Sequence, residues 1–255
     1  MIGNKPSIYN AQSVYNQGGG GSFDVVVNDN KQTLFFPTYL TPVEYIDSST
    51  ELNHFNLVSS RQLEIQNNCT YKCVIEGDLT KTNKTIFRFA AAKGYTGSNA
   101  YIECLLSGTS NYIKFNVNNQ NPWVNCTNFS GIIFIEYRGT TRTLIVKDSN
   151  GHIASDTDTH TINNGVKLAP FGVFSGPELG NSNDYFKGKF YRAFAVKENE
   201  LLFYLQPCKN KDTNEAYIVE LVTGSIGKNN TDNFTPSPSF GPEIDLTQIQ
   251  NYLDL

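Results

Sequence analysis

The chain has 255 residues and a net charge of −4, and its charged residues, only 17% of the total, form no basic run or stripe. This balance argues against nucleic-acid binding by phosphate neutralisation. No apolar run approaches the roughly 18–20 residues that span a bilayer, so no membrane insertion is expected. The length allows a full core, and an aromatic content of 13% with a single Met favours strands joined by polar turns.

Residues 1–22 are predicted to form an N-terminal arm. Gly18 to Gly21 impose no backbone preference and predict a flexible joint. Two similar triplets precede it, and they are either part of a disordered end or a docking peptide that orders against a partner. The candidate docking residues are Ile8, Tyr9, Asn10, Val14, Tyr15 and Asn16.

Between residues 23 and 117, short runs in which apolar and polar residues alternate, together with one apolar run, are typical of half-buried β-strands. Pro37 interrupts one run and predicts an edge strand or a connection there. The runs fall at 23–27, 34–40, 73–79, 87–89, 101–106 and 113–117.

The clearest predicted hairpin spans residues 132–146, with its turn at 139–141. Apolar residues recur at every second position, so each strand has one apolar face. The sequence Asp148-Ser149-Asn150-Gly151 is a strong turn signal and closes this unit.

Residues 184–210 predict two long strands joined by a polar turn at 198–200. The period places six residues of the first strand on one face, namely Phe186, Gly188, Phe190, Arg192, Phe194 and Val196. The tail, 245–255, is predicted to be a short helix capped by Asp245. Its apolar stripe would contain Leu246, Ile249 and Leu253.

Residues 184–243 contain, in order, the sequences GKFYR, a polar turn, LLFYLQPC, YIVELVTG and GPE. This order resembles the closing segment of laminin-G/concanavalin-A-like modules in bacteriophage structural proteins. The hairpin that ends at Gly151 is similar to one that precedes the closing strands in this family. The resemblance reaches back to about residue 60. It implies an all-β, concanavalin-A-like/laminin-G-like jelly-roll sandwich at 23–244, between the arm at 1–22 and the helical tail at 245–255. The resemblance also implies that the protein is a structural component of a bacteriophage virion, similar to a tail or head fibre.

The candidate carbohydrate-binding residues are Trp123, Asn125 and Tyr95. A tryptophan flanked by amides can stack on a sugar ring while the amides bind its hydroxyls. The alternative is that Trp123, the single tryptophan, seals one end of the sandwich.

The sequence contains few motifs that would support catalysis or metal binding. Some concanavalin-like sandwiches are glycoside hydrolases with Glu-x-Asp-x-x-Glu on one strand, but the segment from Glu243 ends in Gln248, which cannot transfer the catalytic proton. No enzyme activity and no cofactor are therefore expected. Calcium bound by Asp148, Asp156 and Asp158 is an alternative. The five cysteines, with no secretory signal in view, predict free thiols in a protein made in the host cytoplasm.

Three functions follow. The first is a virion protein that displays a lectin-like sandwich for attachment to host-surface glycan. The second is an accessory decoration protein that binds no sugar, and the third is a polysaccharide-degrading enzyme. The arm would contact other virion proteins, and several copies would strengthen a weak contact, so a homo-oligomer, with a trimer favoured, is expected.

Overall fold

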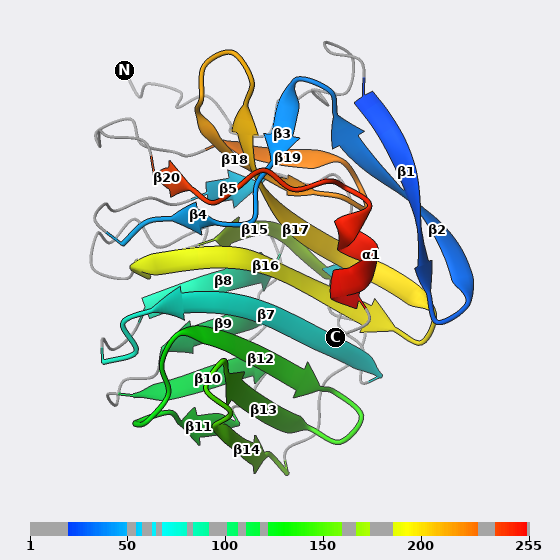
Figure 1. Cartoon of the computed structure of the whole chain (residues 1–255). Coiled ribbons are helices and arrows are strands. Elements are labelled where there is room, and N and C mark those ends of the chain that lie inside the picture. Colours follow the sequence, from blue (N-terminus) through cyan, green and yellow to red (C-terminus); the bar gives the residue numbers. More distant parts are fainter. Residues whose placement is uncertain are drawn as a thin grey trace, which may run out of the picture.

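The computed structural model describes residues 20–49, 55–57, 63–64, 68–80, 84–91, 101–106, 111–117, 122–159, 167–173, 186–228 and 238–253. These residues form two antiparallel sheets that pack face to face, with a hairpin and a short helix outside the larger sheet (Figure 1). The predicted all-β sandwich is therefore confirmed.

The larger sheet has eleven strands in the described part of the chain, and its main path runs β14-β13-β12-β7-β16-β17-β18-β19. The bounds along that path are β14 Ile153–Thr157, β13 Thr143–Asp148, β12 Ile132–Arg138, β7 Cys69–Gly77, β16 Gly188–Lys197, β17 Glu200–Asn210, β18 Ala216–Glu220 and β19 Ser225–Lys228. Three short strands join it, β3 Leu40–Pro42, β4 Ile46–Asp47 and β20 Ser239–Phe240. The predicted hairpin is confirmed as β12–β13.

The smaller sheet has seven described strands, with the main order β11-β10-β9-β8-β15-β5 and β6 paired to β15. Their bounds are β11 Trp123–Asn125, β10 Tyr112–Val117, β9 Tyr101–Leu106, β8 Lys84–Ala91, β15 Lys167–Val173, β5 Phe55–Leu57 and β6 Leu63–Glu64. The remaining strands, β1 Gly20–Val27 and β2 Asn30–Pro37, pair with each other and with no other described strand. The run predicted at 34–40 is divided between β2 and β3, with Pro37 at the end of β2.

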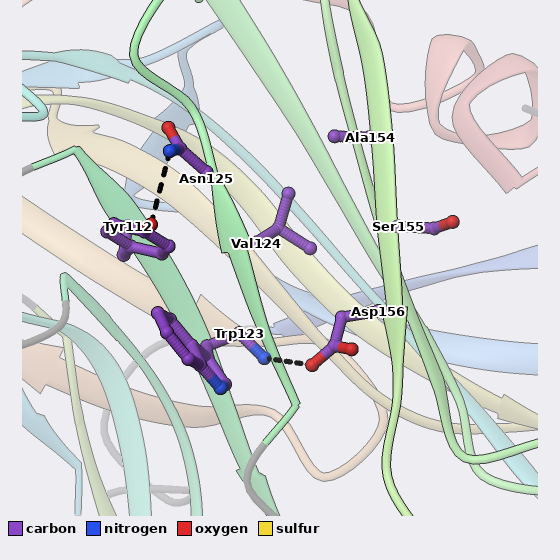
Figure 2. A pocket seen from close by; sticks show the side chains of 7 residues that line it. All are labelled: Tyr112, Trp123, Val124, Asn125, Ala154, Ser155 and Asp156. Atoms are coloured by element: carbon purple, nitrogen blue, oxygen red, sulfur yellow. Dashed lines mark hydrogen bonds between the residues drawn. The ribbon is translucent and has the colours of Figure 1, made fainter.

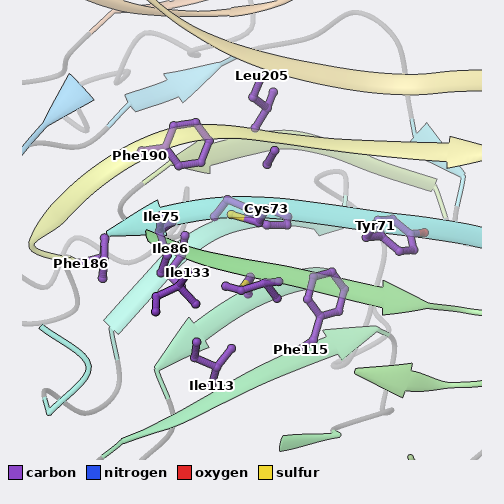
Figure 3. Packing of buried hydrophobic residues seen from close by; sticks show 14 of the residues in the cluster. Tyr71, Cys73, Ile75, Ile86, Ile113, Phe115, Ile133, Phe186, Phe190 and Leu205 are labelled. Atoms are coloured by element: carbon purple, nitrogen blue, oxygen red, sulfur yellow. The ribbon is translucent and has the colours of Figure 1, made fainter. Parts of the chain in front are cut away.

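The main core lies between the two sheets and is built from alternate residues of facing strands (Figure 3). Tyr71, Cys73 and Ile75 of β7 face this core from the larger sheet, and Ile113 and Phe115 of β10 face it from the smaller one. All five are at most 1% exposed. The period-2 patterns read from the sequence therefore mark the inner faces of these strands.

A second apolar cluster covers the outer face of β16 and β17, beneath the β1–β2 hairpin and the helix α1, Gln248–Leu253 (Figure 1). Val25 and Leu34 of the hairpin and Ile249 of the helix are buried there. The Gln250 side chain joins the two elements, because it accepts a hydrogen bond from the N–H of Val26 (2.7 Å) and donates one to its carbonyl (2.9 Å). Strands β16 and β17 are consequently buried on both faces.

Helix α1 confirms the helix predicted in the C-terminal tail. Asp245 lies just before it and accepts a hydrogen bond from the N–H of Thr247 (2.8 Å). Leu246, Ile249 and Leu253 all pack into the second cluster, as their spacing predicted. The stripe therefore docks on the sandwich itself.

Strand β16 departs from its predicted side-chain pattern. Its pairing with β7 shifts between Phe190 and Arg192, which marks a β-bulge. One extra residue inverts the alternation. Phe190 thus faces the core between the sheets, whereas Phe194 and Val196 face the outer cluster. The prediction that one face holds the whole series was wrong beyond Phe190.

Strand β1 begins at Gly20, so the last glycines of the predicted joint and Ser22 belong to the β1–β2 hairpin. Residues 1–19, including the six candidate docking residues at 8–10 and 14–16, lie outside the described residues. Within the described ranges, no helix has the length and apolarity that a membrane span requires.

The five cysteines are buried free thiols, as predicted. Burial raises the pKa of Cys126 to about 12 and holds that of Cys208 well above its ordinary value. Neutral thiols at these positions behave as small apolar side chains. Cys126 accordingly belongs to the core between the sheets, and Cys208 belongs to an apolar cluster on the outer face of β17.

Candidate functional site

The candidate site lies between two edge strands, β11 of the smaller sheet and β14 of the larger sheet. The backbone N–H of Trp123 on β11 donates a hydrogen bond to the Asp156 carboxylate on β14 (3.0 Å; Figure 2). Below this link, Val124 is 2% exposed and Ala154 packs against the main core. These two small side chains close this edge of the sandwich.

Trp123 itself does not seal the sandwich. Its side chain points outward and is 50% exposed, because alternate residues of β11 face solvent and core in turn. The indole lies beside the Tyr112 ring of β10, with ring centroids 4.6 Å apart and planes tilted by 41° (Figure 2). Two adjacent aromatic rings with exposed surface form a platform on which another flat apolar face can stack.

Polar groups flank this platform. Asn125 donates a hydrogen bond from its amide nitrogen to the Tyr112 hydroxyl (3.2 Å). Its amide oxygen is already used, since it accepts from the N–H (2.9 Å) and hydroxyl (2.6 Å) of Thr127. Among the described residues, the second amide hydrogen of Asn125 and the hydroxyl hydrogen of Tyr112 meet no acceptor, so they remain as donors.

Across the platform, Asp156 supplies an acceptor. One carboxylate oxygen accepts from Trp123, and the other accepts no hydrogen bond from the described residues. Ser155 lies next to it on β14 and also lines the groove. The open groove between these two sides has a volume of about 350 Å³, near the lower end of the range for small-molecule sites.

The structure brings Trp123 and Asn125 together, on the same outward face of β11. The third candidate, Tyr95, lies outside the described residues. Sequence reasoning missed Tyr112 as a partner and considered Asp156 only for calcium. The missing signal was the pairing of Tyr112 with Asn125 across β10 and β11, which brings residues thirteen apart side by side.

The three carboxylates of the calcium alternative do not form a cluster. Asp148 ends β13, whereas Asp156 lies toward the far end of β14, paired with Leu144. Asp158 follows β14, and its backbone N–H donates a hydrogen bond to the backbone carbonyl of Arg142 (3.1 Å). No group of three or more His, Cys, Asp or Glu side chains in the described ranges is placed to hold a metal ion.

Asp148 instead organises the turn after β13. Its buried carboxylate accepts hydrogen bonds from the backbone N–H groups of Ser130 (3.0 Å), Asn150 (2.9 Å) and His152 (2.9 Å). The His152 ring nitrogen Nδ1 lies 2.8 Å from the same carboxylate. Burial acts to raise the pKa of Asp148, but the hydrogen bonds from Ser130 and His152 outweigh it and hold the pKa well below its ordinary value.

We expect Asp148→Asn to lower the thermal midpoint at neutral pH. A carboxyl whose pKa is depressed by folding stabilises the protein above its unfolded pKa of about 4, and this contribution is lost as the pH falls toward the folded value. The gap between wild type and variant should therefore shrink below about pH 4. Thermal unfolding of both proteins from neutral pH to below about pH 4 measures the difference in midpoint. A difference that stays constant with pH would contradict the stabilising role of the Asp148 carboxylate.

The hydrolase-like segment is differently arranged. Glu243 is exposed and forms an ion pair with Lys209 of β17 (2.7 Å). Asp245 caps α1, and its hydrogen bonds from the N–H and hydroxyl of Thr247 lower its pKa. Gln248 is the first residue of the helix. The Glu243 and Asp245 side chains are therefore occupied by structural contacts.

The sequence matches no protein-family model and no curated protein. Among solved structures, a protein from Bacteroides ovatus to which carbohydrate binding is ascribed is similar over 84% of this chain and 65% of its own, with 13% identity and a TM-score of 0.45. A heptameric SAP-like pentraxin from Limulus polyphemus is similar over 64% of this chain and 77% of its own, with 11% identity and a TM-score of 0.37. Similarity this distant carries no information about function. The topology by itself assigns the chain to the all-β antiparallel sandwiches.

Proposed function

We propose that the protein is a non-enzymatic carbohydrate-binding module whose site is the groove between β11 and β14. The observation that carries this proposal is the outward-facing Trp123, which lies against Tyr112 with hydrogen-bond donors on one side and the Asp156 carboxylate on the other. A sugar ring has an apolar face that stacks on aromatic rings and hydroxyls that both donate and accept hydrogen bonds. The groove offers a counterpart to each of these features.

The proposed setting is a bacteriophage virion, in which the sandwich is displayed as part of a tail- or head-fibre-like component. The support for this is the resemblance of residues 184–243 to modules of phage structural proteins. The described part of this segment contains strands β16 to β20. The protein would be made in the host cytoplasm and would attach the particle to host-surface glycan. The arm would hold it to other virion proteins, in a homo-oligomer of which a trimer is the favoured form.

Glycan binding is tested with the single variant Trp123→Ala on a glycan array, followed by titration of the best ligands. Loss of the stacking surface should weaken binding at least about tenfold, equivalent to about 1.4 kcal/mol. The matched control is Phe35→Ala, because Phe35 is also an exposed aromatic residue (41%) but lies on the β1–β2 hairpin. Equal weakening by both substitutions, or by neither, would contradict the proposal.

A decoration protein that binds no sugar is the second candidate. One observation favours it, since Val26 (47%) and Phe35 (41%) are exposed apolar residues on the hairpin that follows the arm. A protein that contacts its neighbours through this region needs no ligand in the groove. Absence of binding to every glycan on the array, with assembly impaired by Phe35→Ala, would favour this candidate over the first.

The proposal that the protein is not an enzyme rests on the missing third carboxylate and on the ion pair between Glu243 and Lys209. A hydrolase of this type needs two carboxyl groups that face each other across the scissile bond. Incubation with the glycans that bind should release no reducing sugar. Release that Glu243→Gln abolishes would overturn the proposal.

A further inference from the structure

The two sides of the groove differ in charge and in hydrogen-bonding character. On the aromatic side, Asn125 and Tyr112 each have a polar hydrogen that no described residue accepts, and these hydrogens are donors. On the β14 side, Asp156 has a carboxylate oxygen that accepts no hydrogen bond from the described residues. An ionised carboxylate can only accept hydrogen bonds, so this side requires a donor from the ligand.

From this asymmetry we infer that the groove selects neutral glycans over acidic ones, with Asp156 as the specificity-determining residue. The inference rests on the proposed function and refines its ligand class. Adjacent hydroxyls of a neutral sugar satisfy both sides, because each can donate to Asp156 or accept from Asn125. A carboxylate or sulfate on the sugar supplies no donor and places a like charge near Asp156.

Asp156 is held in place by its other contact, which makes the repulsion hard to relieve. Its bound oxygen accepts the N–H of Trp123, so the carboxylate is tied to the backbone of the platform residue (3.0 Å). A ligand stacked on Trp123 cannot displace Asp156 without breaking this link between β11 and β14. The charge is therefore a fixed feature of the groove.

Lys114 is a cation on the strand that pairs with β11. It pairs with Trp123 across β10 and β11 and would attract an acidic ligand to the outer face of the smaller sheet. Its side chain does not line the groove. The two residues therefore predict opposite preferences, and substitution of each one separately identifies which controls selectivity.

The test uses pairs of oligosaccharides that differ only at the terminal C6, which is a hydroxymethyl group in one and a carboxylate in the other. Titration calorimetry with wild type should show at least tenfold tighter binding of the neutral member. Asp156→Asn preserves shape and an acceptor for Trp123, and it should reduce the preference to less than threefold. Lys114→Gln is the matched control, and it should keep the preference or enlarge it, because it removes a cation that would attract the acidic member.

Ionic strength provides a second measurement on the unaltered protein, since salt screens repulsion between exposed charges. Higher salt should tighten binding of the acidic member and leave the neutral one unaffected. If wild type binds acidic sugars as tightly as neutral ones, or if Asp156→Asn keeps the preference, the inference fails while the proposed function stands. If wild type binds neither member of any pair, the proposed function fails and the inference fails with it.

Discussion

Phe115→Ala should lower the free energy of unfolding by about 3–5 kcal/mol, the usual cost of removing a fully buried aromatic side chain. Phe115 of β10 stacks on Tyr137 of β12, with centroids 4.9 Å apart and planes within 9°. Its ring centroid also lies 5.6 Å from that of Tyr71 and 6.0 Å from that of Phe87, so it joins the two sheets within the core. Rings on several sides prevent the cavity from collapsing.

Urea denaturation of the wild type and the variant measures this loss. Phe35→Ala removes the same atoms from an exposed position on β2 and should cost less than about 1 kcal/mol. A cost for Phe115→Ala as small as that of the control would mean that the sheets do not pack through this residue.

Gly188→Ala should destabilise the protein by about 3 kcal/mol, because it overpacks a closely packed pair of strands. Gly188 of β16 pairs with Gly77 of β7, and both lie against the buried ring of Phe186. A Cβ atom at Gly188 would lie 2.8 Å from that ring and would overlap the backbone carbonyl oxygen of Glu76. Because one obstacle is backbone, a strand must shift to accept a single methyl group.

Gly20→Ala is the matched control, since its nearest obstacle is the Phe36 carbonyl oxygen at 4.0 Å. This variant should unfold at the wild-type urea concentration or slightly above it, since alanine restricts the unfolded chain more than glycine does. Equal midpoints for Gly188→Ala and Gly20→Ala would show that the β7–β16 pair is looser than described.

Local sequence patterns were enough to predict many of the longer strands of the sandwich. The β12–β13 hairpin was predictable because its apolar period and its turn signals lie within one short segment. The helix α1 was predictable from Asp245 and its stripe for the same reason. The β-bulge after Phe190 was not predicted. An extra residue in the pairing of β16 with β7 leaves no signal in the spacing of apolar residues along β16.

The groove was only half predictable. Trp123 and Asn125 are two apart on one strand, so their shared face follows from the period alone. Tyr112 and Asp156 join them through pairing between strands and through contact between the sheets, which depend on tertiary structure. The covering of β16 and β17 by the hairpin and α1 is equally non-local, because the two elements come from opposite ends of the chain.

The central claim, that glycan binds on Trp123, is tested most directly by intrinsic fluorescence. Trp123 is the single tryptophan in the chain, and it is 50% exposed, so tryptophan emission reports on the groove alone. Titration with a glycan that binds on the array should shift the emission to shorter wavelength, because a stacked sugar removes water from the indole. The shift should saturate with the dissociation constant found by calorimetry. Binding by calorimetry with unchanged tryptophan emission would place the ligand elsewhere and contradict the account.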